Sequence, residues 1–177
     1  MISDSAPERR FLVSHDYGMG GAWWWISAHS AREIEATFAE VQVVEDPDRL
    51  ATAATWNVPE VDIDAVTDEV LLALRADRDE QRRHPGFGAF ADRDRVYLNQ
   101  RWDGADDVPA ADYLTEVIDG YRIRQVEVRD DGPAFRSGLD DFVFNPPIDL
   151  WDPELVDQEI TAAEFEKAWA AAEPMPE

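Results

Sequence analysis

Apolar residues recur at two different spacings along the chain, and each spacing predicts a different kind of element. Near the N-terminus, residues 11–14 and 23–28 are rich in β-forming side chains and flank a glycine-rich stretch. We therefore expect two antiparallel strands joined by a long loop. Trp23, Trp24 and Trp25 stand together in the second strand, so alternation places Trp24 on the opposite face from its neighbours. Burial of all three requires a sheet that is covered on both faces; otherwise one of them is an exposed anchor.

Three segments carry the apolar spacing of amphipathic helices. They begin at Ser30, Asp64 and Thr161, and the first and third have a Glu three residues later, the spacing of a capping box. A shorter segment, 49–56, is compatible with a helix or a loop. The apolar stripes of the three helices are, in order, Ile34, Phe38 and Val41; Val66, Val70 and Leu74; and Phe165, Trp169 and Ala172.

The strongest strand pattern lies in the second half of the chain. Asp119-Gly120 lies between two β-rich segments and is typical of a two-residue type I′ turn. In the strand that follows, apolar side chains change parity between Ile123 and Val126. Either both faces of this strand are partly buried, or a bulge near Arg124–Gln125 switches its faces. The predicted meander has strands at 95–102, 113–118, 121–129 and 134–137.

These elements predict an α+β fold. We expect a single domain over residues 1–177, with an antiparallel sheet built from hairpins and a meander and covered by about three helices. Two subdomains are possible within it, a hairpin–helix part at 9–60 and a meander–helix part at 95–172.

The meander and the last helix contain two motifs that resemble a known pattern. The first is Tyr121-x-x-Arg124-x-Val126-Glu127-Val128 followed by Asp131-Gly132, and the second is Ile160-Thr161-x-x-Glu164-Phe165-Glu166-x-x-Trp169. Together they resemble the C-terminal module of a group of small uncharacterised bacterial proteins with no established activity. The resemblance implies an α+β fold and assigns no catalytic residue. Small acidic proteins of this type are similar to immunity proteins that neutralise toxins.

Charge narrows the choice of partner. The chain has 39 acidic and 16 basic residues, so its formal net charge is −23, of which −14 falls in residues 101–177. Such a field repels nucleic-acid phosphates and anionic membrane surfaces, so we expect neither nucleic-acid nor membrane binding. A basic protein partner fits better. A homodimer is also possible, although no pattern specifies one.

The acidity also has a compositional explanation. Lys167 is the single lysine, and the other 15 basic residues are arginines. A GC-rich genome or a high-salt cytoplasm produces such a composition without selection on a binding site. The alternative that the charge is background to an unrelated function therefore stays open.

The chain lacks the residues or motifs that several kinds of site require. The chain has no cysteine, which excludes disulfides and thiolate chemistry. Its three histidines, His15, His29 and His84, lack metal-binding spacing, so we expect neither metal nor cofactor. No apolar run approaches the roughly 20 residues of a membrane span, and the first residues lack the apolar core of a signal peptide, so we expect a cytoplasmic protein.

The glycine-rich loop is the candidate site for chemistry. A carboxylate beside an imidazole can fix its tautomer and raise its basicity, and flexible glycines let backbone N–H groups approach a ligand. This pattern favours an enzyme or a small-molecule binder with its pocket at His15–Gly21, although a purely structural turn explains the same residues. The candidate ligand-binding residues are His15, Asp16, Tyr17, Gly20 and Trp24.

Protein binding is the main hypothesis. The C-terminal half holds pairs of carboxylates near aromatic residues, and such a surface would attract a basic partner while a few apolar side chains supply affinity. An immunity protein or inhibitor is the concrete version. The candidate partner-binding residues are Asp130, Asp131, Asp140, Asp141 and Asp149.

Overall fold

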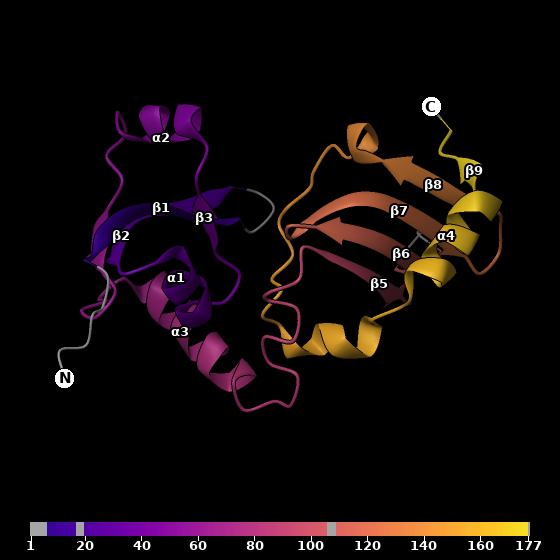
Figure 1. The fold of residues 1–177 in the computed structure, drawn as a ribbon. Helices are drawn as coiled ribbons and strands as arrows, with labels where there is room; N and C mark the ends of the chain where they lie inside the picture. The colour runs from indigo at the N-terminus through magenta and orange to yellow at the C-terminus, as the bar shows by residue number, and fades with distance from the viewer. Residues whose placement is uncertain (1–6, 17–19, 106–108, 177) are drawn as a thin grey trace. The chain divides into compact units, whose positions relative to one another are not determined.

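A computed structural model of the protein describes residues 7–16, 20–105 and 109–176. It confirms the predicted α+β class: the strands form two mostly antiparallel sheets, each with helices against it (Figure 1). The chain divides into two compact units, Met1–Phe87 and Gly88–Glu177, and each unit contains one sheet.

The predicted hairpin is the centre of the first sheet. β1 and β2 pair along their whole lengths, from Arg9 opposite Ala28 to Asp16 opposite Gly21. β3 extends the sheet antiparallel to β1, and β4 extends it parallel to β2. The strand β4, which the pattern did not predict, completes the order β3-β1-β2-β4. The bounds are Arg9–Asp16 for β1, Gly21–Ala28 for β2, Gln42–Val44 for β3 and Glu60–Asp62 for β4.

Helices cover both faces of this sheet. The helices α1 (Ala31–Thr37) and α3 (Glu69–Gln81) lie on one face, and α2 (Pro47–Ala53) lies on the other (Figure 1). Trp24 is 2 % exposed and belongs to the core under α1 and α3, whereas Trp25 is buried in the core beside α2. The two-sided sheet therefore explains how three consecutive tryptophans are largely buried.

The start of α3 corrects the prediction from the sequence. Asp68, not Asp64, caps the helix, because its carboxylate accepts hydrogen bonds from the N–H groups of Val70 and Leu71, both at 3.0 Å. Val70, predicted on the apolar stripe, lies in the first turn of the helix and is exposed. The buried face is instead made by Leu71, Leu74 and Arg78. The segment 49–56, which was compatible with a helix or a loop, is helical in its first part. It belongs to α2, which Asp46 caps.

A buried arginine links α3 to the end of α1. Arg78 is 1 % exposed, and its Nε and Nη2 atoms donate to the carbonyl oxygen of Phe38 at 3.2 and 2.8 Å. Its Nη1 atom donates to Gln81 at 2.6 Å. Because the last carbonyls of a helix lack intrahelical partners, the guanidinium satisfies an acceptor that would otherwise be desolvated without a donor.

The second sheet is the predicted meander with one added strand. β5, β6, β7 and β8 are antiparallel neighbours, and β9 pairs parallel to β8. Asp119 and Gly120 have φ angles of 50° and 79°, as the predicted type I′ turn requires. The bounds are Arg95–Trp102 for β5, Ala111–Ile118 for β6, Tyr121–Arg129 for β7, Ala134–Gly138 for β8 and Glu173–Pro174 for β9.

The strand β7 contains the bulge that its parity change suggested. Glu116 pairs with Arg124, but the next residue of β6, Val117, pairs with Arg122, so Ile123 is the extra residue. The bulge therefore lies one residue before the predicted position. It makes Arg122 and Arg124 project to opposite faces of the sheet, although they are two residues apart.

One face of this sheet packs on α4 (Ala162–Ala171), where Val126, Phe165 and Ala172 are buried. Thr161 and Glu164 form the predicted capping box at its start. The opposite face is covered at one end by side chains of the loops and of the 3₁₀ helix η2 (Pro153–Gln158). A second 3₁₀ helix, η1 (Leu139–Asp141), follows β8.

A charged cluster lies between this sheet and α4. Glu116 is 3 % exposed and accepts hydrogen bonds from Arg124 Nε and, at 3.3 Å, from the Tyr97 hydroxyl. Arg124 also donates to Glu166 of α4 at 2.5 Å. Its guanidinium carbon lies 4.9 Å from the ring centroids of both Phe165 and Trp169. The two sequence motifs thus pack against each other, while their resemblance to other bacterial proteins stays a prediction.

We expect the stability of the α4 contact to fall in acid. Hydrogen bonds from Arg124 lower the pKa of Glu166, and hydrogen bonds from Thr161 lower the pKa of Glu164. A carboxyl group whose pKa is lowered in the folded state stabilises the fold at pH values above its ordinary pKa of about 4.3. This stabilisation is lost as pH falls through the lowered pKa. Urea unfolding at several pH values from 7 to 3 measures it. Glu164→Gln should give a shallower acid slope than the native chain; an equal slope would contradict the assignment.

Candidate functional site

An apolar surface is exposed just after β8, in the segment that we call the 138–145 loop. Val143 is fully exposed, and Leu139 and Phe144 are about half exposed. Scattered single apolar side chains are common on protein surfaces, but three exposed ones within six residues of the chain are a concentration of the kind found at interaction sites.

Hydrogen bonds hold the backbone of the loop in place. Arg122 Nη2 donates to the carbonyl oxygen of Phe144 at 2.8 Å, and Asn145 Nδ2 donates to the carbonyl oxygen of Arg122 at 2.9 Å. The Arg122 guanidinium also stacks at 4.0 Å over the ring of Phe142. Burial under the loop lowers the pKa of Arg122. The exposed apolar side chains are therefore presented by an ordered backbone, which reduces the entropy lost on binding.

Two of the predicted partner-binding residues belong to this loop. Asp140 and Asp141 are exposed between Leu139 and Phe142, and Asp141 also accepts a hydrogen bond from the N–H of Gly138 at 2.7 Å. Asp149 lies on the following segment and accepts a hydrogen bond from the N–H of Trp151 at 3.1 Å. The 138–145 loop therefore combines apolar side chains with carboxylates.

The other two predicted partner-binding residues lie at the far end of the β7–β8 hairpin. Gly138 pairs with Arg124 at one end, whereas Asp130 and Asp131 follow β7 at the other. Asp130 makes a bidentate contact with Arg101 at 2.8 and 2.6 Å, which lowers the pKa of Asp130. The five aspartates therefore do not form one cluster.

The histidine at the glycine-rich loop is buried. His15 Nδ1 lies 2.9 Å from the carbonyl oxygen of Glu40, and because a carbonyl can only accept, Nδ1 carries the proton. Asp16 and Gly20 are exposed, and Gly20 has a φ of 140°. The predicted ligand-binding residue Tyr17 lies outside the described residues. Trp24, predicted as part of the same pocket, is a core residue and offers no surface to a ligand.

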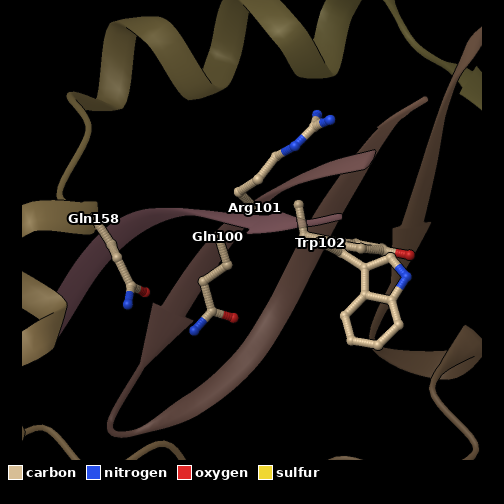
Figure 2. A pocket seen from close by; sticks show the side chains of 5 residues that line it. Gln100, Arg101, Trp102 and Gln158 are labelled. Atoms are coloured by element: carbon tan, nitrogen blue, oxygen red, sulfur yellow. The ribbon is translucent and has the colours of Figure 1, made fainter. Parts of the chain in front are cut away.

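A hollow opens on the second sheet, at a place that the sequence motifs did not single out. It has a volume of about 370 Å³ and is lined by Gln100, Arg101, Trp102, Tyr113 and Gln158. Figure 2 shows Gln100, Trp102 and Gln158 projecting to the same side, while Arg101 points away from them. The sequence could have indicated that Gln100 and Trp102 share one face of a strand, because they are two residues apart. It could not have indicated Gln158, which lies in a 3₁₀ helix far along the chain.

Metal binding and membrane spanning find no support in the described residues. Within 7–16, 20–105 and 109–176, no three His, Asp or Glu side chains gather where they could hold a metal ion. In the same part of the chain, no helix combines the length and apolarity needed to cross a bilayer.

Comparison with protein families, curated proteins and solved structures found no match for this chain.

Proposed function

We propose that this protein binds a basic protein partner through the 138–145 loop, in the manner of an immunity protein or inhibitor. The observation that carries the proposal is the exposure of Leu139, Val143 and Phe144 on a backbone held by Arg122. Affinity in protein complexes is concentrated in a few apolar or aromatic anchors near the centre of an interface. These three side chains are the anchors.

Charge supports the choice of a basic partner. The chain carries a formal net charge of −23, and Asp140 and Asp141 lie directly among the apolar anchors. A negative field raises the rate at which a positively charged protein finds the loop. Complementary residues of the partner, chiefly arginine and lysine, would contact the two carboxylates beside the anchors.

A compositional origin of the acidity does not account for the loop. Carboxylates occur in both units, and several of them cap helices or pair with arginines, including Asp46, Asp68 and Glu166. Genomic composition or adaptation to salt changes charge, but it gives no reason for a fully exposed valine beside two other exposed apolar residues. The apolar part of the surface therefore favours an interaction site.

Affinity capture with the tagged full chain tests this proposal. We expect a stoichiometric basic protein from the native lysate at low salt, with release at high salt because charge contributes to binding. Phe144→Ala should weaken binding of that purified partner by about 30-fold, the effect of a hot spot of about 2 kcal/mol. Asp140→Lys should mainly slow association, which surface plasmon resonance separates from dissociation.

Matched substitutions elsewhere provide the controls. Val156→Ser removes another exposed apolar side chain, and Asp131→Lys reverses a charge at the far end of the β7–β8 hairpin. Both should leave the affinity within about twofold. Equal binding by Phe144→Ala and the native chain, or a partner without net positive charge, would overturn the proposal.

A further inference from the structure

The hollow on the second sheet, called here the Trp102 pocket, brings aromatic and amide side chains together. Gln100 and Trp102 are two residues apart on β5 and project to the same side (Figure 2), and Gln100 pairs with Tyr113 of β6. Gln158 reaches the pocket from the end of η2. The lining therefore has two carboxamides, a phenol and the half-exposed indole of Trp102.

The charges around the Trp102 pocket are paired with one another. Arg101 is held by Asp130 through two hydrogen bonds, so its positive charge is compensated. On the next strand, Glu127 stands opposite Tyr113 and accepts a hydrogen bond from Arg129 at 2.5 Å. A phosphate or carboxylate ligand would need an uncompensated cation. The pocket is thus suited to a neutral ligand.

Its polar groups can both donate and accept hydrogen bonds. The Oε1 atom of Gln158 is buried and has no hydrogen-bond partner among the described residues. A buried acceptor without a donor costs free energy, so a turn of the Gln158 carboxamide that lets a ligand hydroxyl donate to it would be favourable. The hydroxyl of Tyr113 is protonated at neutral pH, as in any tyrosine, and burial raises its pKa further, so it can donate a hydrogen bond.

We propose that the Trp102 pocket binds a neutral sugar, with one face of a pyranose ring stacked on the indole of Trp102. The C–H groups of a pyranose face carry partial positive charge and match the negative face of an indole ring. Ring hydroxyls donate to and accept from Gln100 and Gln158, which offer both functions. The volume of about 370 Å³ lies near the lower end of the roughly 300–1,000 Å³ typical of ligand pockets, which suits one or two sugar rings.

This site is independent of the proposed protein interaction. None of the residues that line the Trp102 pocket belongs to the 138–145 loop. Phe144→Ala should therefore leave sugar binding unchanged, and loss of sugar binding should leave partner capture unchanged. The failure of one proposal is distinguishable from the failure of the other.

Titration of the full chain with the methyl glycosides of glucose, galactose and mannose, and with N-acetylglucosamine, tests the proposal. We expect at least one sugar to give saturable changes in tryptophan fluorescence and in calorimetric heat. Trp102→Ala and Gln158→Leu should each weaken its affinity about tenfold or more. Trp56 is a matched control because it is 49 % exposed, against 46 % for Trp102. Trp56→Ala should bind that sugar like the native chain.

Three outcomes would overturn the proposal. One is the absence of saturable binding by every sugar of the panel up to 50 mM, about 50 times a 1 mM Kd. Another is sugar binding that survives in folded Trp102→Ala and Gln158→Leu variants. The third is binding of adenosine in the same pocket while no sugar binds, which would assign the stacking surface to a nucleobase. Circular dichroism spectra of each variant verify folding.

Discussion

Arg124→Met should lower the free energy of unfolding by about 3 kcal/mol at pH 7, because it leaves the buried Glu116 carboxylate without its main cationic partner. Arg95, whose Nε atom lies 3.6 Å from Glu116, compensates only part of that charge. The substitution also removes the guanidinium from its contacts with the rings of Phe165 and Trp169. Urea unfolding followed by tryptophan fluorescence measures the loss.

A second variant separates the buried charge from packing. Glu116→Gln combined with Arg124→Met removes the negative charge as well, and a glutamine can still accept a hydrogen bond from Tyr97. The double variant should recover to within about 1 kcal/mol of the native chain, since replacing both partners of a buried pair costs far less than removing one. If the double variant is as unstable as Arg124→Met, packing of the arginine, not charge, accounts for the effect.

Arg78→Met should destabilise the first unit by about 3 kcal/mol. The variant leaves the Phe38 carbonyl oxygen, at the end of α1, without the two donors that it has in the native chain. Hydrogen bonds from charged donors contribute roughly 1.5–3 kcal/mol, and a buried acceptor without a donor adds its own cost. Arg78→Lys should recover only part of the loss, because a lysine cannot donate through two atoms in this planar geometry.

Arg83→Met, in the turn directly after α3, is the matched control. Arg83 is exposed and pairs with Glu80 at 2.6 Å, a solvent-exposed ion pair. Its replacement should change the free energy of unfolding by less than about 0.5 kcal/mol. Urea midpoints of the two variants give the comparison. Equal midpoints would mean that Arg78 contributes no more than a surface arginine.

Local patterns in the sequence were sufficient for much of the fold. The type I′ turn at Asp119-Gly120 and the capping box at Thr161 were predicted correctly because each depends on a few neighbouring residues. The start of α3 was not, because both Asp64 and Asp68 are good helix caps and tertiary packing of Leu71 and Leu74 decides between them. The short strands β4 and β9 depend on pairing with distant strands, and three or two residues carry no periodic signal.

The candidate sites were predicted less well, for a physical reason. Asp140 and Asp141 were predicted as partner-binding residues from their charge and the aromatic residues near them in the sequence, whereas the exposure of Val143 depends on how Arg122 holds the loop. The Trp102 pocket joins β5 and β6 to η2, and nothing in the local sequence of Gln158 indicates which strand it approaches. A composition can show that a surface is acidic, but only the folded chain determines which apolar side chains stay outside.

The bulge at Ile123 also favours one register of pairing between β6 and β7. Because of the extra residue, Arg122 faces the side of the 138–145 loop while Arg124 faces Glu116 on the other side. A slip of the β6–β7 hairpin by one residue would exchange the two arginines between the faces. Arg124 would then face away from Glu116, and Arg122 would face away from the carbonyl oxygen of Phe144, so both native hydrogen bonds would be lost together. A hairpin in the wrong register therefore loses two stabilising contacts at once. The contacts of Arg122 and Arg124 thus favour the native register of β6 and β7.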